Sequence, residues 1–296
     1  MKLSISNYIK IFIQKNTAFI FTVPAVLWQI LFLYIPLILV IYTSIQDSSS
    51  TSLWSITLDH YRMIIDWSYL HIIIRSLCVA IGVTFFCLLI AYPVAYFLAL
   101  RIQSGWKNIL LFLLTLPFWT NFLIQIYSWV FVLDYNGLIN TILLPMGIIK
   151  EPMHMINNIY AIIIVMIYYY LPFMLMPLYS ILEKIQHDVL EASLDLGATH
   201  WQTFTRITIP LSLSGIKTGV FLVFVPAFGE FAIPSIIGGG KQMFVGSLVS
   251  HYFLVVRDSN LGAAFTVISG CIVMLCAFLF HWLCKVPTSI TQKEVN

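Results

Sequence analysis

Long gaps between charged residues constrain the fold of this 296-residue chain more than any other feature of its sequence. Each gap can hold about 20 apolar residues, the length that an α-helix needs to cross about 30 Å of hydrocarbon. The gaps free of Asp, Glu, Lys and Arg are 16–46, 76–100, 108–133, 152–182 and 259–284, and a further gap, 218–240, contains Glu230 alone. The pattern predicts six transmembrane helices, with approximate centres at Leu31, Leu89, Phe122, Val165, Val225 and Leu275.

The composition agrees with a chain whose solvent is the lipid bilayer. Hydrophobic residues make up 60% of the sequence and charged residues 9%, which is more apolar than a soluble domain. We therefore expect an all-α, multi-pass integral membrane protein. The net charge of +3 is small and the charges are scattered between the apolar runs, which argues against nucleic acid as a partner.

The distribution of Lys and Arg predicts which loops face the cytoplasm, because cytoplasmic loops carry an excess of both residues. Assigning alternate loops to the cytoplasm places Lys2, Lys10, Lys15, Arg101, Lys107, Lys184, Arg206, Lys217, Lys285 and Lys293 inside, and Arg62, Arg75, Lys150, Lys241 and Arg257 outside. Both termini are then cytoplasmic, with an N-terminal segment 1–16, a six-helix transmembrane domain 17–285 and a tail 286–296. The first apolar run is expected to be a retained helix, because it is too long for a signal peptide and no small-residue cleavage site follows it.

The most polar long segment, 188–210, is predicted to form two short helices joined at a sharp corner. Two pairs have the spacing of a capping residue and its reciprocal acceptor, Asp188 with Glu191 and Thr199 with Gln202. Between them Gly197 can adopt the positive φ that ends one helix. Pro210 is expected to break the second helix. The orientation given by Lys and Arg places this elbow in the cytoplasm.

The order of residues within the elbow resembles the EAA motif of bacterial ABC importer permeases. The segments that carry the resemblance are Glu191-Ala192-Ser193, Asp195-Leu196-Gly197-Ala198, Phe204, Ile207 and Ile209-Pro210. The chain departs from the family pattern at Ser193, where the motif has Ala, and at Ile209, where it has Leu. On the residue pattern alone, a surface loop folded for its own stability is the alternative.

In that family the elbow is the coupling helix, which docks in a groove of the ATP-binding subunit. The resemblance therefore implies a type I ABC importer permease fold with a cytoplasmic coupling loop at 183–212. It also implies ATPase-coupling roles for Glu191, Ala192, Asp195, Gly197, Ala198, Phe204 and Pro210.

The sequence contains no motif for catalysis or for nucleotide or metal binding that we recognise. The run Gly238-Gly239-Gly240-Lys241 lacks the Ser or Thr of a phosphate-binding loop, because Gln242 stands there. The cysteines, Cys78, Cys87, Cys271, Cys276 and Cys284, lie in apolar runs without paired metal spacing, and the seven histidines are scattered. We expect no enzyme activity, cofactor, metal or disulfide in this chain. If ATP drives the protein, another polypeptide must bind it.

Glu230 is the one ionisable residue that the sequence places near the middle of a predicted span. A carboxylate in hydrocarbon costs several kcal/mol, so we expect it to face a cavity or a partner. The alternatives are a structural Glu that is protonated or hydrogen-bonded, and a position nearer the outer end of the span. Asp134 and Tyr135, at the outer end of the third span, are further candidates for a solute path.

Three further segments resemble the spermidine/putrescine permeases of the polyamine importer. They are LPFWTNFLIQIYSW at 116–129, LPFMLMPLYSILEKI at 171–185 and PAFGEFAIPSIIGG at 226–239. In that family two related permeases pair in the bacterial cytoplasmic membrane, two ATPase subunits dock on their elbows, and a periplasmic or extracellular binding protein delivers the polyamine. The resemblance implies these partners and ATP-driven import by alternating access. The alternatives are an ABC permease for sulfate, molybdate, iron or phosphonate, and a proton-coupled secondary transporter or channel.

Overall fold

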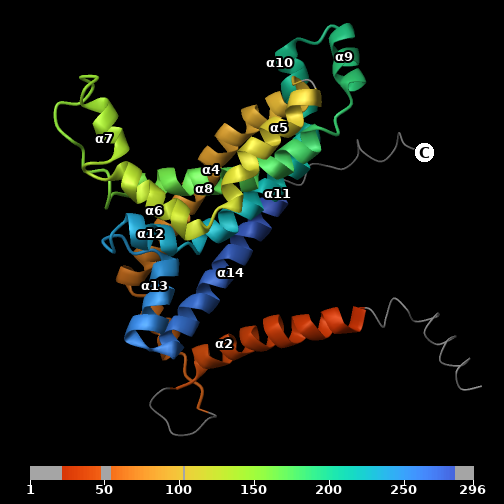
Figure 1. The fold of residues 1–296 in the computed structure, drawn as a ribbon. Helices are drawn as coiled ribbons and strands as arrows, with labels where there is room; N and C mark the ends of the chain where they lie inside the picture. The colour runs from red at the N-terminus through yellow and green to blue at the C-terminus, as the bar shows by residue number, and fades with distance from the viewer. Residues whose placement is uncertain (1–21, 48–54, 103, 284–296) are drawn as a thin grey trace, which may run out of the picture.

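A computed structural model describes residues 22–47, 55–102 and 104–283, and these residues are predominantly helical (Figure 1). Within this part, six helical stretches are long and apolar enough to cross a membrane, which confirms the expected all-α membrane fold. The stretches are Thr22–Ile45, Trp67–Leu100, Phe122–Leu143, Ile159–Leu182, His200–Phe228 and Ser259–Trp282. The expected segment 1–16 and tail 286–296 lie outside the described residues.

Three long helices, α4 (Trp67–Leu100), α8 (Ile159–Leu182) and α11 (Ile209–Phe228), pack against one another at the centre of the bundle. Small residues between membrane helices let the backbones approach closely. A Cβ atom added at Gly219 would lie 2.6 Å from Sδ of Met174 in α8. A side chain at this position would therefore require Met174 to move, and glycine lets α8 and α11 approach closely.

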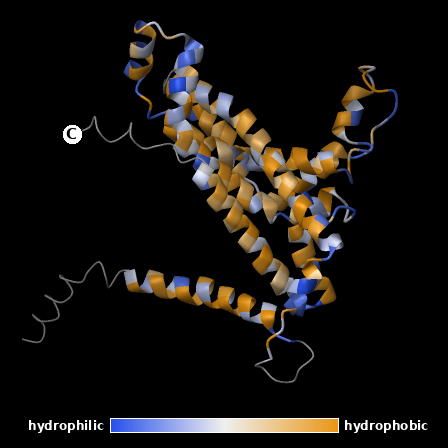
Figure 2. Cartoon of the chain, turned by 180° about the vertical axis from the view of Figure 1, so that it is seen from behind, coloured by the Kyte–Doolittle hydropathy of each residue, from blue (hydrophilic) through white to orange (hydrophobic). Residues whose placement is uncertain are grey.

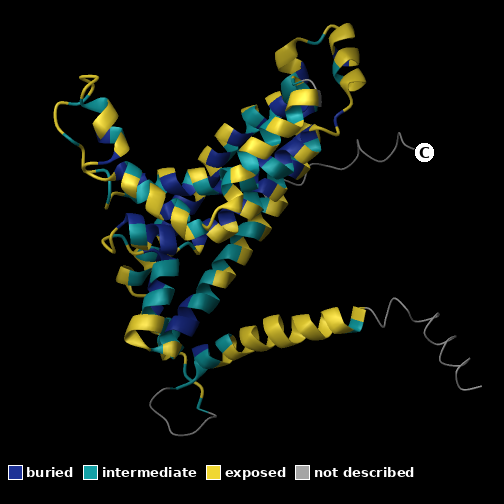
Figure 3. Ribbon diagram, viewed as in Figure 1, coloured by how far each residue is buried: buried dark blue, intermediate teal, exposed yellow. Residues whose placement is uncertain are grey.

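The last span, α14 (Ser259–Leu283), packs on the outside of this core and contacts α2 (Ile35–Ile45). α2 continues the π-helical turn η1 (Ile30–Tyr34), and the two together run away from the bundle (Figure 1). Their surface is largely apolar and mostly exposed (Figures 2 and 3). In a membrane, lipid or another apolar protein surface must cover such a helix.

The third span predicted from the sequence is interrupted, whereas the sequence suggested one helix centred on Phe122. Its parts are α5 (Ser104–Thr115), the 3-10 turn η2 (Leu116–Trp119) and α6 (Phe122–Leu133), and only α6 belongs to the apolar stretch Phe122–Leu143 given above. Pro117 stands at the start of η2. The Asn121 side chain then caps α6 by accepting a hydrogen bond from the backbone N–H of Leu123 (2.9 Å). The apolar segment thus contains a helix stop and a new helix start, and Phe122 lies at the start of α6.

Pro210 does not break a helix, and this expectation was wrong. The helical parts α10 (His200–Thr203), η3 (Phe204–Thr208) and α11 form one continuous stretch. In the π-helical turn η3 the backbone N–H of Ile209 donates to the carbonyl of Phe204, five residues back. This wider turn accommodates a proline, which has no N–H and whose ring crowds the preceding turn. The second helix of the elbow is therefore the beginning of the fifth span.

The fifth span also ends earlier than a centre at Val225 implied. α11 stops at Phe228, and a short non-helical segment leads into α12 (Ala232–Ile237). Glu230 consequently lies in a break between two helices and not in the middle of one. The remaining short elements are α3 (Asp59–Ile64), α7 (Leu138–Leu143), α13 (Val245–His251) and the π-helical turn η4 (Tyr252–Val256).

Candidate functional site

The elbow lies at one end of the bundle, next to the end of α8 and the start of the fifth span (Figure 1). Its first helix, α9 (His187–Asp195), is followed by Gly197, whose φ of +85° turns the chain toward α10. The predicted capping box at the start of α10 is confirmed. Thr199 Oγ1 accepts from the backbone N–H of Gln202 (3.3 Å), and Gln202 Oε1 accepts from that of Thr199 (2.8 Å).

The other predicted cap, at Asp188, is not formed. α9 begins at His187 and Gln186 precedes it, so that Asp188 lies inside the first turn and caps nothing with its side chain. Its carboxylate still favours the helix, because negative charge near a helix N-terminus interacts well with the unpaired N–H groups there. The helix is present as predicted, but it begins closer to the N-terminus than the prediction placed it.

A buried pair of hydroxyl groups ties the two helices of the elbow together. Ser193 Oγ lies 2.8 Å from Thr203 Oγ1 and donates to the carbonyl oxygen of Leu190 (2.7 Å). The Thr203 hydroxyl is therefore the donor between the two side chains, both of which are buried. Ser193 is a position where the chain departs from the EAA pattern, and here the departure adds a hydrogen bond across the corner.

The outer surface of the elbow is exposed and unpaired. Glu191 and Asp195 are exposed on α9 and, within the described residues, make no side-chain hydrogen bond or ion pair. Ala192 is also exposed. Leu196 is 89% exposed and Trp201 is 71% exposed. Carboxylates beside exposed large apolar side chains are typical of a contact surface for another protein.

Phe204 faces the bundle. Its ring packs edge-on against Tyr92 and Tyr96 of α4, with ring centroids 5.8 and 5.7 Å apart. The Tyr92 hydroxyl is hydrogen-bonded to Ser212 of α11 (2.9 Å). Ala198, in the corner itself, is half-buried. Of the predicted coupling residues, Phe204 therefore anchors the elbow to α4, and the tyrosines that receive it were not singled out from the sequence.

A second polar cluster lies where α8 ends and the elbow begins. Glu183 Oε1 accepts hydrogen bonds from the Tyr179 hydroxyl (2.6 Å) and from Nζ of Lys107 in α5 (3.1 Å). Lys107 Nζ also lies 5.7 Å from the centre of the Tyr179 ring. The hydrogen bond from Tyr179 and, after it, the contact with Lys107 lower the pKa of the Glu183 carboxyl. Glu183 is thus charged at neutral pH, in a cluster that sequence reasoning missed because Lys107 is distant along the chain.

Glu230 is held by donors from two helices. Its Oε2 accepts from the hydroxyl of Tyr170 in α8 (2.7 Å). Its Oε1 accepts from the backbone N–H groups of Ala232 (2.9 Å) and Ile233 (3.4 Å), at the start of α12. The hydrogen-bonded arrangement that the sequence left open is therefore present, and the partly exposed carboxylate joins α8 to the helix break.

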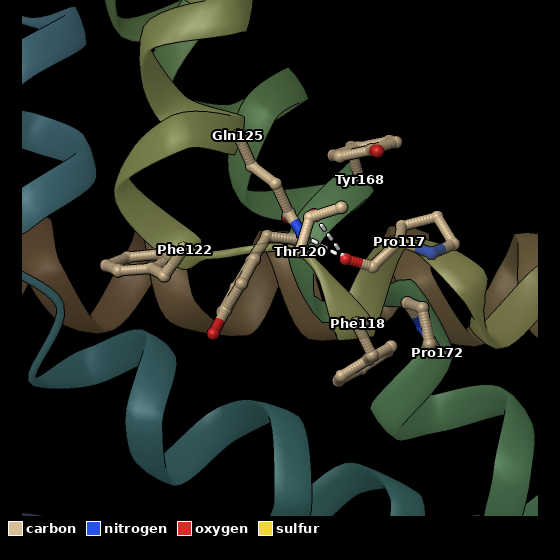
Figure 4. Close-up of a pocket in the computed structure, with 8 residues that line it drawn as sticks. Pro117, Phe118, Thr120, Phe122, Gln125, Tyr168 and Pro172 are labelled. Atoms are coloured by element: carbon tan, nitrogen blue, oxygen red, sulfur yellow. Dashed lines mark hydrogen bonds between the residues drawn. The ribbon is translucent and has the colours of Figure 1, made fainter.

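A cavity of about 170 Å³ lies between the interrupted third span and α8 (Figure 4). It is lined by Pro117, Phe118, Thr120, Phe122, Gln125, Tyr168, Tyr169 and Pro172. The Gln125 amide donates to the carbonyl oxygen of Pro117 and so braces the break of the third span. On the opposite wall, the Tyr169 ring contacts that of Tyr170 (centroids 5.1 Å apart), whose hydroxyl binds Glu230. Aromatic faces therefore line the cavity, and the Glu230 carboxylate is bound by Tyr170, the residue next to this lining.

Asp134 and Tyr135 do not line this cavity. They follow α6, where Asn140 donates to both of their carbonyl oxygens (3.3 and 3.0 Å). The Tyr135 ring stacks on His154, with centroids 4.7 Å apart. In the described part of the chain no contact joins either residue to Glu230, so that the structure keeps the two predicted parts of the solute path separate.

Among the described residues, no group of three or more His, Cys, Asp or Glu side chains is placed to hold a metal ion. Cys78, Cys87, Cys271 and Cys276 are free thiols, and Cys284 lies outside the described ranges. The glycine run after α12 forms a turn, since Gly239 and Gly240 have positive φ.

Comparisons with known proteins give a matching family model and several similar proteins. A family model described as "Binding-protein-dependent transport system inner membrane component" matches residues 91–286. The spermidine/putrescine transport system permease protein PotB of Salmonella typhimurium (strain LT2) is 41% identical over 274 residues, which is 91% of this chain and 95% of that protein. PotB of Escherichia coli (strain K12) is 41% identical over 257 residues, which is 86% of this chain and 93% of that protein.

A more distant relative and a solved structure extend the comparison. PotB of Haemophilus influenzae (strain Rd) is 38% identical over 256 residues, which is 86% of this chain and 89% of that protein. The fold is similar to that of a chain in the crystal structure of a bacterial alginate ABC transporter in complex with alginate pentasaccharide-bound periplasmic protein. The TM-score is 0.74 at 16% identity, over 92% of this chain and 96% of the other. The structural likeness concerns the fold alone.

Proposed function

Because the chain belongs to the family of binding-protein-dependent transport system inner membrane components, we propose that it is the membrane permease subunit of an ATP-driven importer of polyamines. The observation that carries the proposal is its 41% identity, over 91% of its length, to the spermidine/putrescine permease PotB. The chain is a multi-pass protein of the bacterial cytoplasmic membrane, with six apolar spans. We assign it no reaction and no cofactor of its own, because a partner subunit binds and hydrolyses ATP.

The elbow is the surface on which the ATPase subunit docks. Glu191 and Asp195 offer exposed carboxylates, and Leu196 and Trp201 offer apolar contact area beside them. Aromatic side chains that lose their solvent in an interface commonly carry much of the binding energy. Gly197 gives the corner between the two helices its positive φ. Closing of an ATPase dimer then pushes on this corner.

A push on the elbow reaches the membrane interior through one helix. The stretch His200–Phe228 has 29 residues, so that it extends over about 43 Å at 1.5 Å per residue. Its first turn belongs to the elbow and its last turn precedes Glu230. Movement of the elbow therefore displaces the helix break at which Glu230 is held, which provides a route for alternating access.

The site near Glu230 has the chemistry that a polyamine requires. A polyamine carries ammonium groups separated by methylene spacers, and ammonium groups bind carboxylates and the faces of aromatic rings. An ionised carboxylate has about four lone-pair sites, and donors in this chain use three of those on Glu230. One site remains for a solute ammonium group, with the ring of Tyr169 nearby. Asp134 and Tyr135 stay candidates for an outer part of the path.

We infer three kinds of protein partner. They are a dimer of ATP-binding subunits, a second homologous permease, and a periplasmic or extracellular polyamine-binding protein. Two permeases are needed because one chain offers one elbow, and an ATPase dimer has two docking grooves. The exposed apolar helix α2 requires lipid or protein around it, and the second permease is one source of that cover.

Reconstitution into liposomes tests the proposal. This chain alone is compared with the chain combined with its ATPase, second permease and binding protein, and radiolabelled spermidine uptake is measured with ATP on the ATPase side. We expect uptake only in the full set and only with ATP. Uptake by the chain alone in a proton gradient would instead establish a secondary transporter. ATP-dependent uptake of sulfate, molybdate, iron or phosphonate in place of spermidine would overturn the choice of solute.

A further inference from the structure

The cluster of Lys107, Tyr179 and Glu183 joins the elbow to α5, the helix that carries Lys107. Glu183 follows the last residue of α8, and three residues separate it from α9. Three residues span at most about 11 Å, and Ile185 among them is buried. A displacement of α9 therefore acts on Glu183 through a short and partly buried connection.

On the other side of the cluster, Leu110, Leu111 and Leu114 of α5 pack against the hydrophobic core, but the space between α5 and α4 is incompletely filled. A cavity of about 550 Å³ lies between α4 and α5, and both helices line it with apolar side chains such as Phe97, Leu110 and Leu113. Side chains that border an unfilled apolar space can shift more easily than closely packed ones. The Lys107 side chain is only 17% exposed and donates a hydrogen bond to Glu183. This ion pair therefore connects α5 to the elbow with a defined geometry.

The far end of α5 leads to the cavity of about 170 Å³ beside α8, which we take as part of the proposed solute path and call the solute cavity. η2 and the start of α6 follow α5 directly, and Pro117, Phe118 and Gln125 from this break line the cavity (Figure 4). Helix breaks at proline act as points at which a helix bends. Because α5 spans 12 residues, or about 18 Å, movement at Lys107 is carried along it to the cavity wall.

We propose that Lys107, Tyr179 and Glu183 form a latch that transmits movement of the coupling elbow through α5 to the wall of the solute cavity. This inference rests on the proposed function and adds a second route of coupling, beside the continuous fifth span. We assign the three side chains a positioning role and no contact with solute or ATP. The Tyr179 hydroxyl holds the carboxylate, and its ring lies near the lysine, so that the ion pair has a fixed geometry.

The test measures spermidine uptake and ATP hydrolysis together in the full complex, with this chain carrying Lys107→Glu, Glu183→Lys or both. Each single variant places like charges side by side and opens the latch, whereas the double variant restores opposite charges. We expect each single variant to keep binding the ATPase but to move at least about fivefold less spermidine per ATP hydrolysed. Fivefold is the lower end of the range over which one site ordinarily affects another. The double variant should recover most of this ratio.

A matched control reverses the exposed ion pair of Asp59 and Arg62, which lies away from the elbow (3.6 Å between the charged atoms). Its reversal should leave spermidine per ATP unchanged. Tyr179→Phe, which removes only the hydroxyl, should give a smaller loss than Glu183→Lys.

Two results would overturn the latch. One is a single variant that assembles and keeps the wild-type ratio of spermidine to ATP, and the other is an assembled double variant that stays as uncoupled as the single variants. If the single variants fail to assemble, the double variant and Tyr179→Phe decide the question. A wild-type complex that shows no ATP-driven spermidine uptake would contradict the proposed function, which is a different outcome from any of these.

Discussion

A single carboxylate, that of Glu230, both caps α12 and offers negative charge at the helix break. Glu230→Gln keeps the size of the side chain and removes the charge, so that a solute ammonium group loses a charge-assisted hydrogen bond. Such a bond contributes about 1.5–3 kcal/mol, and we expect uptake to fall at least about tenfold. Spermidine uptake by the full complex is the measurement, with complex assembly as its check.

The matched control for this variant is Tyr170→Phe, which removes one donor to Glu230 and leaves the charge in place. If attachment to α8 were the whole role of Glu230, both variants should impair transport to a similar degree, since Tyr170→Phe leaves the bonds from α12 to Glu230 in place. If the charge is required, Glu230→Gln should be clearly worse. Wild-type uptake by Glu230→Gln would remove this residue from the solute path.

Ser193 supports a second prediction at the residue scale. Ser193→Ala restores the family's alanine but leaves the buried Thr203 hydroxyl without this partner. We expect a loss of about 1 kcal/mol in the free energy of unfolding, seen as a lower midpoint in thermal unfolding of the detergent-solubilised chain. The double variant Ser193→Ala with Thr203→Val removes both hydroxyls and should lie closer to wild type. An unchanged midpoint for Ser193→Ala would show that the hydroxyl pair contributes nothing.

At the scale of elements, the corner of the elbow depends on Gly197. A Cβ atom there would meet nothing within 4 Å, but the φ of +85° is costly for a residue with a side chain. The left-handed conformation costs about 1–2 kcal/mol, so Gly197→Ala should lower the affinity of the ATPase subunit about 5- to 30-fold by depopulating the docking conformation. Binding of the purified ATPase to the permease pair measures this.

Two substitutions bracket the result for Gly197. Gly197→Asn should bind better than Gly197→Ala, because asparagine tolerates this conformation. Gly82→Ala, inside α4 and with open space around it, should leave ATPase binding unchanged, since alanine favours a helix there. Wild-type affinity for Gly197→Ala would mean that the turn is not required for docking.

Most spans and the elbow could be predicted because they depend on properties that are local in the sequence. Charge-free gaps indicate spans, and Gly197 and Thr199 carry the turn and the cap within a few residues. The effect of a proline is not local. Pro117 coincides with a break because Asn121 starts a new helix beside it, whereas Pro210 stays helical because a π-helical turn precedes it.

The contacts of the candidate site also could not be predicted, because they join residues far apart in the chain. Glu230 was singled out for its charge, but its bond to Tyr170 follows from the packing of α8 against the helix break. The same holds for Lys107 and Glu183, which were seen only as charges bounding apolar runs. The sequence shows which residue types are available for a site, but the packing of the helices decides which of them are in contact.

At the scale of the whole molecule, α8 extends from one end of the bundle to the other. Its 24 residues extend over about 36 Å, from the segment that contains α7 to the elbow (Figure 1). This length exceeds the roughly 30 Å of hydrocarbon in a bilayer. The two ends of α8 therefore lie on opposite sides of the membrane, and the excess of Lys and Arg predicts that the elbow is on the cytoplasmic side.

Labelling of single cysteines in a chain otherwise free of cysteine tests this orientation. We expect a membrane-impermeant thiol reagent, added to intact cells, to label Met146→Cys beyond α7 and to leave His200→Cys in the elbow unlabelled until the membrane is opened. Both positions are exposed, so that access and not burial decides the result. The reverse pattern would place the elbow outside, where no ATPase could reach it, and would overturn both the orientation and the coupling role that depends on it.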